Sequence, residues 1–335
     1  MEVREVEIND YSKVADFLSL NFLPQLPSRS YLDKFNLWWD KNPFFINEDI
    51  RGWILVDPEN DLAVKGFLGN IPADYRVGEQ VLKTASPSFW CVDLEYRTKA
   101  LDLLFPYIRQ NKDILVNSTP GPVTEKIFAG LGFKNINNEL KSYMHFCNVN
   151  GFKSFLARKI KNKLLLNLNV GFLRIPLFIY NIFTFVQFVN GTTSVSLTDD
   201  SIECLPEFIT LENLKWLGNE NFKIKACRGK YGLVISQYVQ NQSNGLNYLE
   251  IVYSQNMSLK YLRSLKKYLM GLHGVDQIDT LVIRNSSKQS DLRFGFVDVT
   301  KFTRTLCLVK GPKAKELEGK VVTSIFGEKG FMLWN

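Results

Sequence analysis

Histidine is scarce in this chain of 335 residues, and its cysteines are scattered. The only histidines, His145 and His273, lie far apart, and no two of the five cysteines form a CxxC pair. A zinc site needs clustered imidazoles or thiolates, and a disulfide framework needs an ordered cysteine pattern. We therefore expect no metal site and no disulfide scaffold. With only two histidines, a Ser-His-Asp triad is also not favoured.

A secretory signal is also not expected. The chain begins Met1-Glu2-Val3-Arg4-Glu5, without a basic segment followed by an apolar run. This start predicts a cytoplasmic protein. The net charge of +7 favours anionic partners, which include a phosphorylated cofactor, nucleic acid and an acidic membrane surface, without choosing among them.

The length exceeds what one ordinary hydrophobic core accommodates, so two domains are expected. Hydrophobic periodicity predicts an α/β (α+β) fold in which helices pack on a mixed, mostly antiparallel sheet. In the first half we expect strands at 3–8, 52–56, 64–71, 88–92, 114–117 and 141–147, and helices at 11–20, 31–40, 99–110 and 123–131.

The second half repeats this order of elements. Strands are expected at 223–228, 232–239, 247–253 and 280–284, and helices at 211–217 and 259–272. Gly295-Phe296 follows residues 291–294 as Gly132-Phe133 follows Ala129–Leu131. We interpret this as a divergent internal duplication, with domains at 1–150 and 203–335 and a linker at 151–202.

The linker has an unusual composition, a basic lead followed by an apolar run that Arg174 and Pro176 interrupt. These interruptions disfavour a transmembrane span. Two interpretations stay open: a brace that packs across the two domains, or peripheral contact with the inner membrane face through residues 153–188.

The most informative stretch is a strand, a turn and a helix between Phe89 and Leu104. With the elements that follow, it resembles the GNAT superfamily of acyltransferases. The matching residues are Val92, Tyr96, Arg97, Asn117 and Gly132-Phe133. The segment Trp39…Asn42-Pro43 resembles double-GNAT relatives of bacterial surface-polysaccharide clusters, which suggests polysaccharide biosynthesis. The resemblance covers residues 1–147 well. Residues 203–335 match only as a divergent copy.

The resemblance implies a cofactor, acetyl-CoA or another acyl-CoA. Its pyrophosphate would bind the backbone amides that open the helix, because such amides lack partners in an α-helix. The implied cofactor-binding residues are Val92, Leu94, Arg97, Thr98, Lys99, Ala100, Leu101 and Asn117. Val92 and Leu94 would contact the pantetheine arm in a gap between two diverging strands.

Two departures from the family pattern concern catalysis. Phe128 stands where the family places a tyrosine that protonates the leaving thiolate, and Asp102 puts a carboxylate near the expected pyrophosphate. Asp93 and Glu95 are the candidate catalytic bases. The alternative is that Asp93 braces the turn and Glu95 is solvated. Cys91 is expected to be a small buried side chain rather than a nucleophile.

Three functions follow from these patterns. The first is an N-acyltransferase that acts on a small-molecule amine such as an amino sugar. The second is a Fem-type aminoacyl-transferase, which uses a charged tRNA donor. The third is a catalytically inactive GNAT-like binding protein. The loop from Arg97 to Leu101 favours the acyl-CoA donor, and no aromatic signature for nucleic-acid binding is present.

Overall fold

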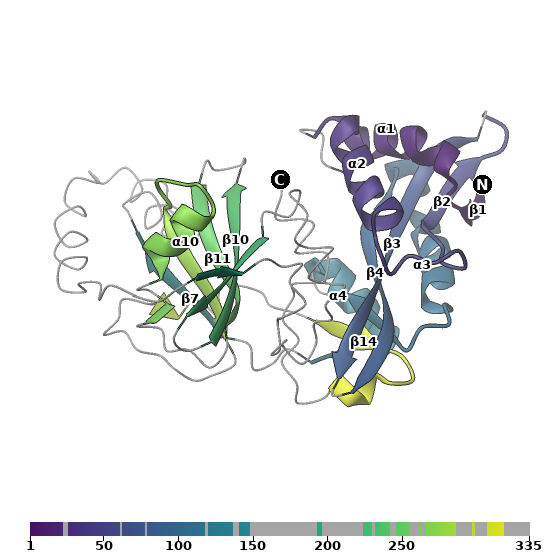
Figure 1. The fold of residues 1–335 in the computed structure, drawn as a ribbon. Coiled ribbons are helices and arrows are strands. Elements are labelled where there is room, and N and C mark those ends of the chain that lie inside the picture. The colour runs from purple at the N-terminus through teal and green to yellow at the C-terminus, as the bar shows by residue number, and fades with distance from the viewer. Residues whose placement is uncertain are drawn as a thin grey trace, which may run out of the picture. The chain divides into compact units, whose positions relative to one another are not determined.

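The computed structural model describes residues 1–22, 26–60, 62–77, 79–117, 120–136, 141–147, 193–195, 224–229, 232–241, 246–254, 261–262, 265–285, 297–298 and 307–317. The expected linker and the helix at 211–217 fall almost entirely outside these residues. The described part forms two compact units, each built on its own seven-stranded sheet (Figure 1).

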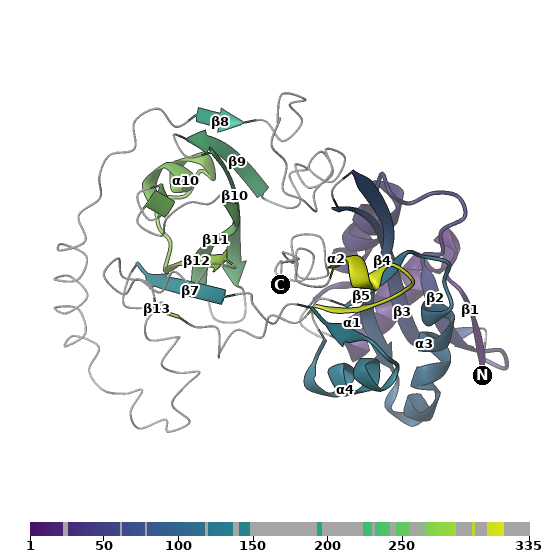
Figure 2. The same ribbon diagram turned by 90° about the horizontal axis from the view of Figure 1, so that it is seen from below.

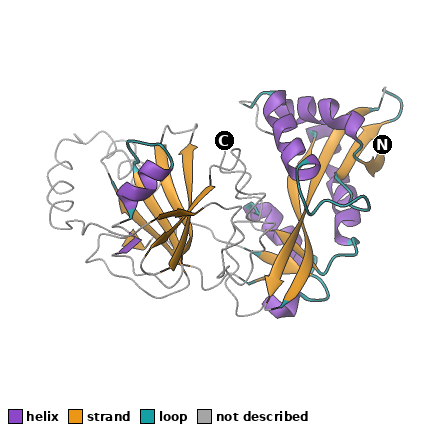
Figure 3. Cartoon of the chain, in the orientation of Figure 1, coloured by secondary structure: helices purple, strands orange, loops and turns teal. Residues whose placement is uncertain are grey.

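The expected fold class is confirmed, since both sheets are mixed, mostly antiparallel and flanked by helices (Figure 3). In spatial order the first sheet contains β1 (Glu2–Glu5), β2 (Gly52–Asp57), β3 (Ala63–Val77), β4 (Gln80–Val92), β5 (Ile114–Asn117), β14 (Leu308–Lys310) and β6 (Lys134–Asn135). The second contains β13 (Val297–Asp298), β7 (Lys141–Phe146), β12 (Thr280–Asn285), β11 (Leu246–Ser254), β10 (Gly232–Asn241), β9 (Ile224–Gly229) and β8 (Thr193–Val195).

Helices cover both faces of the first sheet. One face carries α1 (Tyr11–Asn21), α2 (Ser28–Phe35) and the π-helical η2 (Asn36–Asp40), and the 3-10 helix η1 (Ile8–Asp10) precedes α1. On this face Phe35 packs on Phe67, and Trp38 packs on Phe89. The other face carries α3 (Ala100–Ile108) and α4 (Pro122–Gly130). Their core residues Leu103, Leu104 and Phe128 pack with strand residues that include Leu68 and Leu115.

Several expected elements are confirmed almost residue for residue. The strand at 114–117 is β5, and the helices at 11–20 and 123–131 are α1 and α4. Gly132 follows α4 with a φ of 86°, a conformation that glycine adopts without strain and that commonly ends helices. β3 and β4 are longer than expected, because they form one extended hairpin that reaches beyond the buried part of the sheet.

The two sheets exchange a strand. β7 was expected to be the last strand of the first sheet, but it pairs with β12 and β13 in the second. Its place beside β5 is taken by β14, which also pairs with β6 (Figure 2). β14 was not expected at all, since three residues are too few for a periodic signal. The domain ranges 1–150, 151–202 and 203–335 stay a prediction.

The exchanged strand is fixed at one end by Asp113. The Asp113 carboxylate accepts a hydrogen bond from the Lys83 N–H at 2.8 Å and forms an ion pair with Lys313 at 3.1 Å. Against the cost of burial, these contacts lower the pKa of this carboxyl group. Gly311, at φ 146°, passes so close to the Asp113 carbonyl that an added Cβ would collide with it. The corner before β5 therefore holds the segment after β14.

In the second unit, α10 (Lys266–Leu272) covers one face of the sheet. Leu265 and Leu269 pack there with residues of β11 and β12, among them Ile251 and Leu281. Read across the sheet from β1 in the first unit and from β8 in the second, the order of antiparallel and parallel strand pairs is the same. Each described sheet has a single parallel pair, β4 with β5 in the first and β11 with β12 in the second.

Candidate functional site

The parallel pairs of the two sheets differ in length. In the first sheet, β4 and β5 pair only at Thr84↔Ile114 and Ala85↔Leu115. β4 then continues to Val92 and β5 to Asn117 without further pairs between them. In the second sheet, β11 and β12 stay paired over four positions. The expected gap between diverging strands is thus present in the first unit. We call this region, β4 after Ala85 and β5 after Leu115, the splay.

A tyrosine lies where the two strands part. The Tyr107 hydroxyl donates a hydrogen bond to the Ala85 carbonyl at 3.0 Å, and it lies 3.5 Å from the Val116 carbonyl. The whole Tyr107 side chain is buried in the core. Beyond Ala85 the two strands form no pairs, so their carbonyls there lack partners on the other strand. The Tyr107 hydroxyl contacts two carbonyls at this point and so closes the inner end of the splay.

β4 bulges inside the splay. Gly69 pairs with Ser88 and Phe67 with Cys91, so Phe89 and Trp90 both oppose Leu68. Phe89 has a φ of 51°, which is uncommon for a residue with a side chain. The bulge sends Phe89 to the aromatic cluster with Tyr31, while the Trp90 indole donates to the Ala100 carbonyl at 3.2 Å. Trp90 therefore ties the end of β4 to the start of α3.

The turn after β4 differs from the expected anion site. A 3-10 helix, η3 (Leu94–Lys99), leads directly into α3, and the Ala100 N–H donates to the Arg97 carbonyl. A 3-10 helix uses backbone N–H groups in i→i+3 bonds that the start of an α-helix would leave free. The expectation of an unpaired amide is therefore wrong for Ala100. The side chains of Arg97, Thr98 and Lys99 are exposed on this turn.

The two candidate bases lie at the start of this turn. The Asp93 carboxylate accepts a hydrogen bond from the Glu95 N–H at 3.3 Å, and the Asp93 N–H donates to the Lys65 carbonyl at 2.9 Å. Asp93 thus braces the turn, as the alternative interpretation holds. Glu95 is exposed. Asp102 lies 3.5 Å from Lys99 in an exposed i,i+3 ion pair, which directs its charge toward that cation.

The remaining expected residues lie on the two strands. Val92 and Leu94 flank Asp93, and Leu94 is 69% exposed. Asn117 is buried at the end of β5, opposite Leu308 of β14. Parallel strands bring their carboxyl ends to one edge of a sheet, so the turn after β4 and Asn117 share that edge.

Two further residues limit the chemistry. Burial, with the Asp93 charge, raises the pKa of the Cys91 thiol to about 11, so Cys91 is a protonated thiol near neutral pH and a poor nucleophile. Phe128 is fully buried, and its ring lies 4.7 Å from that of Phe133 and 6.4 Å from that of Trp90. The position at which the resemblance implies a proton-donating tyrosine is therefore part of the hydrophobic core.

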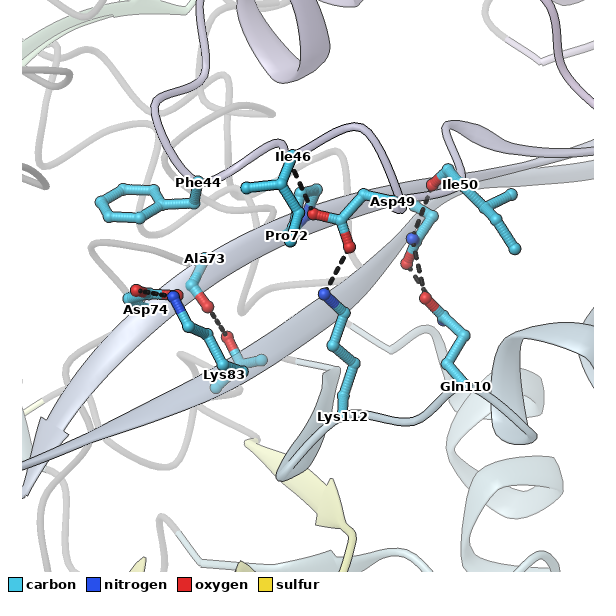
Figure 4. Close-up of polar contacts among 12 residues, drawn as sticks. Phe44, Ile46, Asp49, Ile50, Pro72, Ala73, Asp74, Lys83, Gln110 and Lys112 are labelled. Carbon is cyan, nitrogen blue, oxygen red and sulfur yellow. Dashed lines mark hydrogen bonds and ion pairs between the residues drawn. The ribbon is translucent and has the colours of Figure 1, made fainter.

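A buried polar network, which sequence patterns did not identify, positions the inner end of the splay. Asp49 forms an ion pair with Lys112, and both side chains are largely buried (Figure 4). The Asn70 amide donates to the Ile50 carbonyl at 2.8 Å and to the Gln110 side chain at 2.9 Å. The network joins a loop, β3 and the end of α3, and so fixes the chain where it enters β5.

The second unit contains a partly buried Ser-His contact. The Ser236 hydroxyl lies 2.9 Å from Nε2 of His273. Burial, with the charge of Lys225, lowers the pKa of His273 to about 4. Ser236 has no exposed surface, so this pair stabilises the unit rather than offering a nucleophile to solvent.

Within the described segments, no three metal-ligating side chains come together, and no helix is long and apolar enough to cross a membrane. The linker residues proposed to contact a membrane lie outside those segments.

Comparisons with known proteins bear on the fold of the chain. No protein-family model and no curated protein matches the sequence. Solved structures do match. A GCN5-related N-acetyltransferase from Anabaena variabilis aligns with a TM-score of 0.54 at 10% identity, over 94% of this chain and 74% of that one. Another from Kribbella flavida aligns with a TM-score of 0.52 at 12% identity, over 94% and 73%. The chain therefore has the fold of GCN5-related N-acetyltransferases along nearly its whole length.

Proposed function

We propose that this protein is an acyl-CoA-dependent N-acyltransferase whose first unit binds the donor. The observation that carries the proposal is the splay, where a parallel pair opens after two positions beside a bulge in β4. The chain has the fold of GCN5-related N-acetyltransferases, and acetyl-CoA is the simplest donor. The acceptor is a small-molecule amine, with an amino sugar as the first candidate.

The second unit is proposed to be a divergent copy that supports the first. Its strands pair in the same order of directions, but its parallel pair stays closed over four positions. Where β11 and β12 stay paired, their backbone groups bond to each other and are not available to the pantetheine arm of a donor. A scaffold or acceptor-binding role fits this unit better than donor binding.

Acyl transfer to an amine needs a group that removes a proton from the attacking ammonium. Glu95 suits this role better than Asp93, because one Asp93 oxygen already accepts the Glu95 N–H. The donor's pyrophosphate would meet the cationic side chains of Arg97 and Lys99 rather than a full set of free amides. The thiolate would take its proton from solvent, since Phe128 cannot donate one.

A second function, ligand binding without catalysis, is favoured by one specific observation. Phe128 is fully buried among Tyr107, Trp90 and Phe133, so no acid stands at the family's position for it. An inactive protein would still bind acyl-CoA in the splay.

Two measurements separate these functions. Thermal stability would be recorded with and without acetyl-CoA; saturation at 100 times the dissociation constant stabilises by about 2.7 kcal/mol. Thiol release would then be followed with a panel of amines that includes amino sugars. Binding with amine-dependent thiol release supports the transferase. Binding without release supports the inactive protein, and absence of binding rejects both.

A further inference from the structure

Ser88 is a buried serine on the edge of the splay. It lies on β4 directly before the bulge, paired with Gly69, and only 1% of its surface is exposed. Among the described residues, its hydroxyl has no hydrogen-bond partner. An unpaired buried hydroxyl lowers stability, so its presence calls for an explanation.

The same strand shows how such a hydroxyl is usually satisfied. Thr84 lies four residues earlier, at the last paired part of β4, and is equally buried. Its hydroxyl donates to the Ala73 carbonyl at 2.9 Å. Thr84 thus finds a backbone carbonyl on the neighbouring strand, whereas Ser88, opposite Gly69 on the same strand, finds no partner among the described residues.

The position of Ser88 relates it to the proposed donor. It lies between Ala85, where the strands part, and Val92, where the turn with Arg97 begins. Four residues of strand from Ser88 to Val92 span about 13 Å. A ligand arm that is held at the turn and runs back along β4 therefore brings its far end to Ser88. In an acyl-CoA, that far end carries the thioester.

We propose that the Ser88 hydroxyl donates a hydrogen bond to the carbonyl oxygen of the bound acyl thioester. The proposal rests on the proposed function and adds to it a side chain that recognises the acyl group. A hydroxyl donates one hydrogen bond, and a serine side chain turns about a single bond to aim it. Because the site is buried, this one bond distinguishes an acylated donor from free CoA, which has no carbonyl there.

The test compares two ligands and three proteins by calorimetry. Acetyl-CoA and CoA would be titrated into the unaltered chain, Ser88→Ala and the control Thr84→Val. In Ser88→Ala we expect acetyl-CoA to bind about 3- to 10-fold more weakly, the range of one neutral hydrogen bond, and CoA to bind unchanged. Thr84→Val should leave the ratio of the two affinities unchanged.

Melting temperatures without ligand provide an independent readout. Ser88→Ala should melt at the same temperature as the unaltered chain or higher, because it removes an unsatisfied group, and Thr84→Val should melt lower. An unchanged affinity ratio in Ser88→Ala, or an equal loss for both ligands, overturns the role of Ser88 alone. If the unaltered chain binds neither ligand, the proposed function falls as well.

Discussion

Val116 of β5 lies directly opposite Val309 of β14 in an antiparallel ladder. Both side chains are buried, and β14 is paired on its other edge with β6. The strand next to the β6 edge of the first sheet thus comes from the far end of the sequence.

Replacing Val309 by proline tests this dependence. Val309→Pro removes a backbone N–H from a strand that is paired on both edges, as well as the side chain, whereas the control Val309→Ala removes only the side chain. We expect the proline variant to lose about 3 kcal/mol more than the alanine variant in the free energy of unfolding of the first unit. Urea denaturation followed by tryptophan fluorescence measures it, and equal losses would contradict the pairing of β14.

Charge reversal at Arg97 tests the donor site. Arg97→Glu places an anion on the exposed turn after β4, where the proposal puts the pyrophosphate, so acetyl-CoA should bind about 10- to 100-fold more weakly. Arg109→Glu is the matched control, because Arg109 is exposed at the opposite end of α3. Calorimetry at low salt gives both affinities. Equal behaviour of the two variants would place the phosphates elsewhere.

Phe128→Tyr should not restore a catalytic acid. The new hydroxyl would enter a core where Phe128 has no exposed surface and packs on Phe133. Burying it without a partner should cost about 1–3 kcal/mol of stability. Phe105→Tyr, on the exposed side of α3, should be nearly neutral. Thermal melts and thiol-release rates would be compared; a tyrosine variant that melts normally and turns over faster would show that the phenol can reach the thiolate.

The second unit should lose stability in mild acid. The folded unit holds His273 neutral with a pKa of about 4, while the unfolded chain protonates it near 6.5. The unfolded state therefore binds more protons between these values, and stability falls as the pH drops from 6.5 to 4. From pH 7 to pH 5 the loss from this group is about 2 kcal/mol.

His273→Gln keeps a polar side chain near Ser236 and removes the titration. The difference in unfolding free energy between this variant and the unaltered chain should change with pH over the same window. Denaturant midpoints at pH 7, 6 and 5 measure that difference, and a constant difference would mean that His273 titrates normally in the folded unit.

Local patterns in the sequence predicted the elements but not all of their partners. The segment 114–117 is a buried apolar run between turn signals, and this is enough to specify β5. The segment 141–147 alternates in the same way whichever sheet receives it, so its strand was predicted and its sheet was not. β14 has only three residues, and its place depends on long-range contacts such as those of Asp113.

The candidate site was predictable to a similar extent. The family resemblance located the turn after β4 and the splay, because these features depend on a continuous stretch. It did not predict that η3 would use the Ala100 amide, since the family pattern implies an α-helix start there and the structure has a 3-10 turn that Asp93 caps. Ser88 and Tyr107 gave no sequence signal, because their roles arise from the register of β4 against its neighbours.

The exchange of β14 for β7 also sets an order of events during synthesis. When β5 and β6 leave the ribosome, the strand that belongs between them has not yet been made, and β7, the next strand to appear, belongs to the other sheet. Until then the nascent first sheet lacks the strand between β5 and β6, and the exposed edges of these two strands can pair wrongly. A protein built this way completes its proposed donor-binding unit only once residues 308–310 have been translated, so a stalled or shortened chain would lack both a finished site and a stable first unit.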